Sequence, residues 1–213
     1  MKKPQMITVE LLSDATFSRG EGTAGVVDIE IEHDEFGLPF MGGKTLHGLL
    51  RDGWLSMEGS FPELRSAADR IYGPPGDLAE TSILRIGDAE LERAVKEWVA
   101  WSVRRKHNPL SPGQILAALS DIRAQTSEER ESGAPAETTL RSTRVVLRGL
   151  LFISPLTWLA EPTTDDLRCL ALGVLAARHA GLARHRGRGL VRLALDGDHE
   201  MTHRYARGEE LEL

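Results

Sequence analysis

The sequence predicts an α+β fold whose core runs strand, helix, strand, strand, helix, strand. Three observations predict this class. Short segments rich in apolar and β-branched residues lie near both ends of the chain, segments with helical periodicity lie between them, and long polar stretches interrupt the pattern. This element order is that of the ferredoxin-like, or RRM-like, fold. We expect one such domain over residues 1–213, with long insertions at about 13–41 and 102–142.

The first part of the chain supplies a strand and the first core helix. Residues 6–12 mix β-branched and apolar residues and predict the first strand. Residues 26–34 alternate apolar and acidic side chains, which is typical of an extended, half-exposed segment. A glycine pair then precedes a helix whose apolar residues fall on one face. These apolar residues are Leu46, Leu49, Leu50 and Trp54.

The middle of the chain predicts shorter elements. Residues 62–71 read as a short helix that ends at a Gly-Pro-Pro-Gly breaker, and residues 81–91 contain a short strand. A helix is expected over 90–101, followed by a basic, proline-broken loop at 104–114. Residues 126–142 are polar and hold Gly and Pro without apolar periodicity, so we expect an exposed excursion there.

The last third predicts the second half of the core. Residues 143–156 read as one strong strand, and residues 163–182 as a strong helix that Thr164 caps and Gly181 closes. A turn at 183–189 then alternates arginine with glycine and other residues before the final strand begins at Leu190. Glycine lets a backbone approach a ligand closely, and guanidinium groups bind phosphate in a bidentate way. This turn is therefore a candidate polyanion site.

Composition restricts the class of protein. Charged residues make up 27% of the chain and hydrophobic residues 41%, as in an ordinary soluble globular domain. Only 5% are aromatic, which argues against RNA binding by base stacking on sheet aromatics. Cys169 is the only cysteine, which excludes a disulfide framework and favours a cytoplasmic protein. No stretch approaches about 20 consecutive apolar residues, so we expect no membrane span.

Charge is distributed unevenly. The formal net charge is −6, which by itself argues against nucleic acid as a partner. Six acids and no Lys or Arg lie between Glu21 and Glu35, whereas four arginines and no acid lie between Arg184 and Arg192. This pattern fits two solvated patches of opposite sign, and it equally fits a polyanion-facing edge on an acidic protein.

The second candidate anion site is the segment "GGKTLHG" at 42–48. A glycine pair leading into a helix leaves backbone N–H groups and the positive end of the helix dipole pointing outward. Lys44, Thr45 and His47 add donors there, and Arg51 lies one turn beyond His47. The spacing is not that of a Walker motif, and a tight turn that caps a core helix explains the same residues. In the expected fold, the arginine-glycine turn lies beside the start of this first helix, so the two glycine turns share one edge.

Four segments, in order along the chain, resemble the motif blocks of the RAMP (repeat-associated mysterious protein) superfamily. Residues 25–52 resemble its signature "D-x-x-G-x-P-x-I-P-G-S-S-L-K-G-x-x-R", and residues 70–91 resemble the next block. Residues 121–152 look like the block in which an excursion leads into a strand, and 185–193 like the closing glycine-rich loop. The blocks look most like the repeated backbone subunits of type III CRISPR effector complexes.

The resemblance implies partners and RNA contacts. It implies a subunit that stacks along guide (CRISPR) RNA with copies of itself, related RAMP subunits and other effector subunits, and whose excursion acts as a thumb that splays the guide–target RNA duplex. The RNA-binding positions it implies are Lys44, Thr45, His47, Arg51, Arg123, Arg130, Arg141, Arg184, Arg186 and Arg188. This chain departs from the signature at His47, which stands where the family has lysine.

The resemblance also implies a candidate catalytic residue. Asp28 corresponds by position to the aspartate with which catalytic backbone subunits cut target RNA, and it would need Mg²⁺ or Mn²⁺ as metal cofactor. Glu30 and Glu32 share its face and could help hold the ion, or could simply be solvated. Two alternatives stay open: a catalytically inactive structural subunit, and a guide-processing endoribonuclease that uses a histidine. Such processing enzymes usually contain two ferredoxin-like halves, whereas 213 residues with one closing loop fit one half better.

Overall fold

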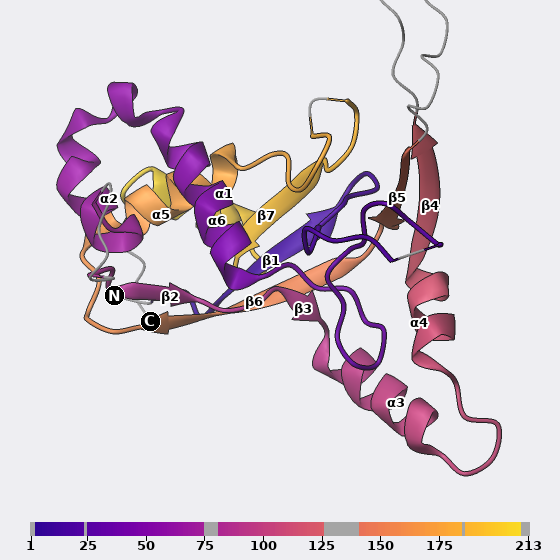
Figure 1. Ribbon diagram of the computed structural model, residues 1–213. Coiled ribbons are helices and arrows are strands. Elements are labelled where there is room, and N and C mark those ends of the chain that lie inside the picture. The colour runs from indigo at the N-terminus through magenta and orange to yellow at the C-terminus, as the bar shows by residue number, and fades with distance from the viewer. Residues whose placement is uncertain (1–2, 24, 75–80, 126–140, 185, 210–213) are drawn as a thin grey trace, which may run out of the picture.

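The computed structural model describes residues 3–23, 25–74, 81–125, 141–184 and 186–209 (Figure 1). Its helices and strands are β1 (Met6–Leu11), α1 (Gly43–Leu55), η1 (Glu58–Ser60), η2 (Pro62–Leu64), α2 (Arg65–Tyr72), β2 (Leu84–Ile86), β3 (Glu90–Leu91), α3 (Arg93–Arg104), α4 (Pro112–Leu119), β4 (Ser120–Gln125), β5 (Arg141–Val146), β6 (Leu151–Trp158), α5 (Thr164–Ala176), β7 (Val191–Leu195) and α6 (His199–Ala206). Among these described residues, no helix is both long and apolar enough to cross a bilayer.

The central sheet has the predicted ferredoxin-like arrangement. Its strand order is β2–β6–β1–β7, and β3 pairs with β6 beyond β2, so β2 and β3 are two pieces of one interrupted strand. All these pairings are antiparallel, and Val9 of β1 lies opposite Phe152 of β6 and Leu193 of β7. The prediction of an α+β, βαββαβ core is confirmed.

Two helices cover one face of this sheet. Alternate residues of β1 are buried, namely Ile7, Val9 and Leu11, because their side chains point toward the helical layer. Figure 1 shows α1 and α5 side by side over the strands, and their buried leucines complete the core. The predicted apolar face of α1 is confirmed, since all four of its predicted core residues are buried.

The start of α5 differs by one residue from the prediction. Thr163, not Thr164, caps the helix, and a capping box joins its side chain to Asp166. Asp166 is fully buried and accepts hydrogen bonds from the guanidinium of Arg70 on α2. The cap therefore also ties α2 to α5. A further helix, α6, follows β7, and Asp198 caps its N-terminus. Sequence periodicity did not predict this helix.

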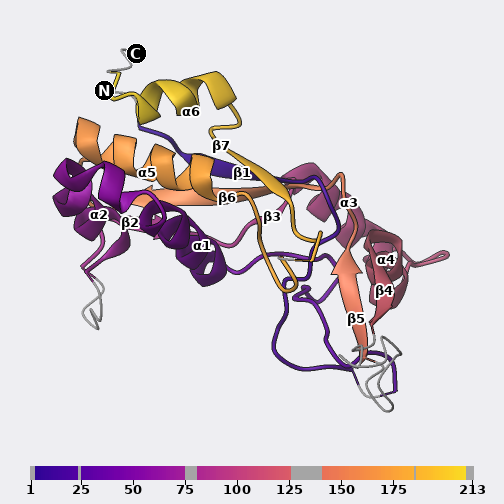
Figure 2. The same cartoon turned by 90° about the horizontal axis from the view of Figure 1, so that it is seen from above.

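Residues 143–156 form two strands rather than the single predicted one. β5 ends at Val146 and β6 begins at Leu151, and Gly149 between them has a φ of +85°. At this turn the chain passes from a separate two-stranded hairpin, β4–β5, into the central sheet. Figures 1 and 2 both place this hairpin, with α3 and α4, at the opposite end of the molecule from α2. The hairpin leads into the predicted excursion, of which residues 126–140 lie outside the described part of the chain.

The acidic segment at 26–34 is not a regular strand. It makes isolated bridges, such as Ile29 with Thr143, and Glu30 and Ile31 are both buried although they are consecutive. The predicted alternation fails because Glu30 turns inward to an ion pair. Its Oε1 lies 2.7 Å from Nε of Arg144 on β5, and the two side chains are only 3% and 12% exposed. This pair attaches the first insertion to the hairpin.

We predict that the Glu30–Arg144 pair is the most stability-sensitive ion pair of the described fold. Arg144→Met leaves a buried carboxylate without its cation and should lower the free energy of unfolding by about 3–5 kcal/mol, whereas Glu30→Leu/Arg144→Met should recover most of that loss. Urea unfolding followed by circular dichroism measures both. The control is Arg192→Ala, which removes a partly exposed partner of Glu10 and should cost about 1 kcal/mol or less. Equal losses for Arg144→Met and the control would contradict the prediction.

Candidate nucleic-acid interface

A groove of about 350 Å³ lies between one face of α1, from Gly42 to Asp52, and the Arg–Gly loop, which we define as residues 180–189. Helix α1 and the residue before it contribute one wall, the loop contributes the second, and residues 16–18 with Glu32 close the third. The polar lining residues are Thr16, Ser18, Glu32, Lys44, Thr45, Asp52 and Arg184. Gly42 of the first glycine turn and Arg184 of the second both line this groove, but Arg184 pairs with Asp52 near the end of α1 rather than lying beside the helix start.

The start of α1 differs from the predicted anion site in one respect. The N–H of Gly43 donates to Oδ1 of Asp88 at 2.7 Å, so the protein's own carboxylate occupies part of the helix N-terminus. A Cβ at Gly43 would lie 2.3 Å from the carbonyl oxygen of Ile86, so glycine there allows close packing against the loop after β2. The groove wall is instead formed by Gly42 and the exposed side chains of Lys44 and Thr45.

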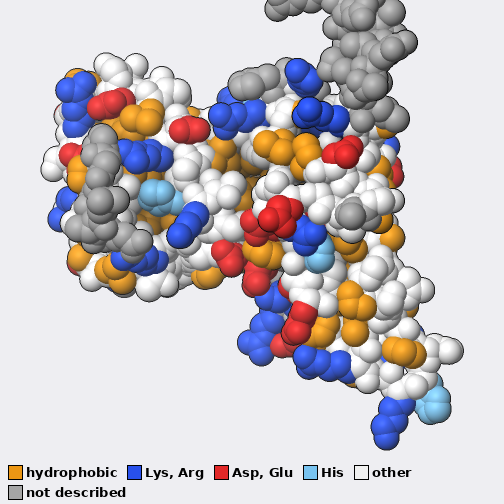
Figure 3. Space-filling view, in the orientation of Figure 1, with side chains coloured by type: hydrophobic (Ala, Val, Ile, Leu, Met, Phe, Trp, Pro, Cys, Tyr) orange, Lys and Arg blue, Asp and Glu red, His pale blue; other side chains and the backbone are white. Residues whose placement is uncertain are grey.

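The Arg–Gly loop is closed by backbone bonds. Gly189 has a φ of +71°, and a Cβ there would lie 2.0 Å from the carbonyl oxygen of Ala180. Ala180 and Gly189 are joined by a backbone hydrogen bond, and the N–H of Gly189 also donates to the carbonyl of Asp14. This closure presents Arg184 and Arg186 to solvent and leaves Arg188 half-buried. Figure 3 shows Lys and Arg side chains gathered along the upper edge of the molecule, at this loop and the neighbouring hairpin.

Two acidic residues, Asp52 and Glu32, line the groove together with its cations. The sequence analysis did not predict either of them at this site. Oδ2 of Asp52 lies 3.7 Å from Nη1 of Arg184, and Glu32 lines the same groove. The signal for Asp52 is its spacing, because Lys44, Gly48 and Asp52 follow one another at four-residue intervals and therefore share a helix face. An exposed ion pair contributes about 1 kcal/mol or less, so a phosphate group can replace Asp52 as the partner of Arg184.

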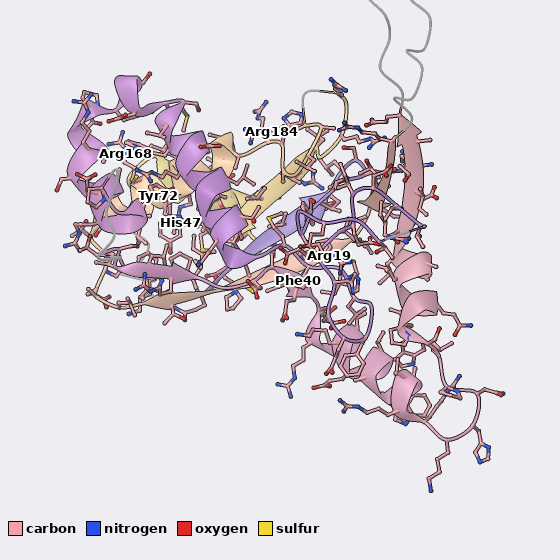
Figure 4. The ribbon with its side chains drawn as sticks, viewed as in Figure 1. Arg19, Phe40, His47, Tyr72, Arg168 and Arg184 are labelled. Atoms are coloured by element: carbon pink, nitrogen blue, oxygen red, sulfur yellow. The ribbon has the colours of Figure 1, made fainter. Side chains whose placement is uncertain are left out.

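His47 and Arg51 lie on another side of α1. The His47 ring packs edge-on against Tyr72 of α2 with centroids 5.8 Å apart, and Figure 4 places both residues away from Arg184. Burial lowers the pKa of His47 below 6.5, and the positive charges of Arg51 and Arg85 lower it further. The structure therefore separates the four predicted α1 contacts, with Lys44 and Thr45 in the groove and His47 and Arg51 beside α2 and β2.

The predicted contacts near the excursion are placed in part. Arg123 on β4 pairs with Asp14 at 3.1 Å and with Asp121 at 2.7 Å, so acids already surround it. Arg141 is exposed at the first residue of β5. Arg130 lies outside the described residues.

Asp28 lies where the hairpin leads into the excursion, beside the start of β5. Its Oδ2 accepts hydrogen bonds from the N–H and the hydroxyl of Ser142 at 2.7 and 3.1 Å. These bonds lower the pKa of Asp28, and the charge of Arg141 adds to the effect. The side chain is exposed and therefore stands ionised at neutral pH beside the excursion.

A metal at Asp28 would have few other protein ligands. Glu30, expected on the same face, is buried and bonded to Arg144, so that expectation is wrong, and Glu32 lines the groove instead. Within the described ranges, no group of three His, Cys, Asp or Glu side chains could hold an ion. The donor set still fits Mg²⁺ or Mn²⁺, because Mg²⁺ commonly binds one or two carboxylates and fills its other positions with water and substrate phosphates.

We predict that His47 is neutral at pH 7 and titrates below pH 6.5. The largest cause is burial, so Arg51→Ala should raise its pKa only in part, and the pKa should stay below 6.5. Two-dimensional NMR of the His47 ring across pH 4.5–8 measures the midpoint in parent and variant. His203, on α6, is exposed and serves as the reference ring in the same spectra. A His47 midpoint at or above 6.5 in the parent would show that the ring is not desolvated.

The sequence matches no protein-family model, and no curated protein matches it. Solved structures do match in fold. One is a chain of the type III-B Cmr-beta complex bound to cognate target RNA, with a TM-score of 0.63 and 11% identity, covering 90% of this chain and 96% of that one. Another is a chain of the same type of complex in its apo state, with a TM-score of 0.65 and 12% identity, covering 91% and 97%. The chain therefore has the fold of a chain in type III-B Cmr complexes.

Proposed function

We propose that this protein is a guide-RNA-binding backbone subunit of a type III CRISPR effector complex. The observation that carries the proposal is the groove between α1 and the Arg–Gly loop, in a chain with the fold of a Cmr-beta complex chain. The first sequence block that resembles the RAMP superfamily, residues 25–52, supplies the α1 wall of that groove and Glu32. Guide RNA, target RNA and other effector subunits, copies of this chain or related RAMP subunits included, are the proposed partners.

The groove suits an RNA backbone rather than RNA bases. Lys44, Thr45 and Arg184 offer donors of the kinds that bind phosphate oxygens, and no aromatic side chain other than Phe17 is among the lining residues. Phe17 itself is 3% exposed and packs on Phe152, so it offers no platform for a base. Contacts to the RNA backbone hold RNA of any sequence. A backbone subunit needs such sequence-independent binding, because the guide alone determines the target.

We predict that Arg184→Ala/Arg186→Ala/Arg188→Ala weakens guide-RNA binding at least tenfold and flattens its salt dependence. Each lost phosphate contact to a single strand lowers the slope of log K against log salt by about 0.7, so the slope should fall by about 1–2. Fluorescence anisotropy with labelled guide RNA between 50 and 300 mM salt measures this slope.

The control for this prediction removes the same charge elsewhere. Arg65→Ala/Arg204→Ala/Arg207→Ala takes three exposed arginines from α2 and from the region of α6, away from the groove. It should keep the parental slope. If the loop variant and the control give the same slope, the Arg–Gly loop does not contact phosphate, and the proposed binding mode is wrong.

We further propose that Asp28 carries metal-dependent cleavage of target RNA, with the inactive structural subunit as the alternative. A bound Mg²⁺ or Mn²⁺ would activate the attacking oxygen and offset charge on the phosphate. The protein's contribution is the exposed, ionised carboxylate, which the two Ser142 bonds fix in orientation at the base of the excursion. The third alternative, guide processing by a histidine, has less support, since the described residues form one ferredoxin-like sheet.

We predict that Asp28→Asn abolishes cleavage of a matched target RNA by the assembled complex, by at least a hundredfold, and preserves target binding. The amide keeps an oxygen for the Ser142 bonds but loses the charge that holds a divalent ion. Cleavage is followed on gels with Mg²⁺, with Mn²⁺ and with a chelator. Asp69→Asn, an exposed aspartate on α2, is the control and should cut normally. Equal cutting by Asp28→Asn would remove Asp28 from the site, and no cutting by any form would leave the structural alternative.

A further inference from the structure

Helix α3 presents an aromatic stripe to solvent. Val99 and Ser102 are buried on its inner face, whereas Trp98 and Trp101 are 57% and 59% exposed on the outer one. Val95, 40% exposed, precedes them at the same three-residue spacing, so the three side chains form a continuous row. Two half-exposed indoles in one row are unusual on a surface and indicate a contact that the isolated chain does not make.

Cations lie directly beside this stripe. The guanidinium carbon of Arg105 lies 5.6 Å from the ring centre of Trp101, and its Nε donates to the carbonyl of Asn108 at 2.8 Å, which holds it there. Lys106 and His107 follow and are exposed. No Asp or Glu occurs between residues 98 and 120, although the whole chain is acidic. The stripe therefore has a positive border on its C-terminal side, while on its N-terminal side Glu97 adjoins it and is ion-paired with Arg93.

We propose that Trp98, Trp101 and the cations at 105–107 form a second RNA-contact surface, which takes unpaired nucleotides. One side of the Trp101 ring is covered by Arg105, and the exposed remainder offers a platform on which a base can stack. Arg105 and Lys106 then lie where the attached phosphates need cations. Duplex RNA cannot use the surface in this way, because its bases are already stacked and paired.

The charge pattern favours RNA over a protein partner. The core of a protein–protein interface is depleted of charged residues, whereas here a run of cations adjoins the indoles. The site is also distinct from the groove. Figure 1 shows α3 at the far end of the molecule from the Arg–Gly loop, so a strand held at α3 is not the stretch that lies along α1. The inference therefore does not depend on the groove being an RNA site.

The test uses the full chain and single-stranded oligouridylate RNA. Binding should quench tryptophan fluorescence, and Trp98→Gln/Trp101→Gln should remove the quench and weaken oligouridylate binding at least fivefold. Glutamine suits an exposed helix position, so the variant should keep its fold, which circular dichroism checks. The matched control is Leu159→Gln, which replaces a side chain that is 57% exposed elsewhere and should bind like the parent.

Two further arms separate this proposal from the proposed function. RNA that carries 5-iodouridine should crosslink to residues 93–108, and it should do so in the Arg184→Ala/Arg186→Ala/Arg188→Ala variant as well. An unchanged affinity in the double tryptophan variant, or crosslinks confined to the groove, would overturn the α3 site and leave the groove standing. Loss of self-association in sedimentation, without loss of RNA binding, would overturn it too and assign the stripe to a subunit contact.

Discussion

The buried pair between Glu30 and Arg144 is the interaction on which the candidate site depends. A buried carboxylate is tolerable only when it is paired and hydrogen-bonded, and Glu30 meets both conditions through Arg144, the N–H of Ile31 and the hydroxyl of Thr23. The pair holds a long insertion without regular strands against β5, where the N–H of Arg144 also donates to the carbonyl of Ile29. Asp28 lies two residues before Glu30, and Ser142 lies two residues before Arg144. The ion pair therefore fixes how these two segments align, and Asp28 keeps its two bonds to Ser142.

The first insertion also links the hairpin to the Arg–Gly loop. Asp14 accepts from Arg123 of β4 and from the backbone N–H of Arg148, while its carbonyl accepts from Gly189. One residue therefore connects the hairpin with the loop that closes the groove.

Sequence patterns predicted the parts of the fold that depend on local periodicity. The face of α1 and the strand order followed from apolar spacing and element order, and one groove holds residues of both glycine turns. The failures at the candidate site have one cause, which is tertiary contact. Glu30 turned inward because Arg144, 114 positions away, offers it a partner, and Asp88 bonds to Gly43 at the start of α1 across 45 positions. His47 faces Tyr72 rather than the groove because α2 packs there. No local pattern encodes these partners.

The acids inside the groove bear on how the proposed subunit would bind RNA. Lys44 and Arg184 face Glu32 and Asp52, so one groove attracts a phosphate only weakly beyond its hydrogen bonds. Weak sites become effective when many copies share one strand, because each further contact forms at a high effective concentration. A strongly basic groove would instead hold any RNA on a single free subunit. Under the proposed function, the balanced charge favours an assembled row of subunits over isolated binding, and this reconciles a net charge of −6 with an RNA partner.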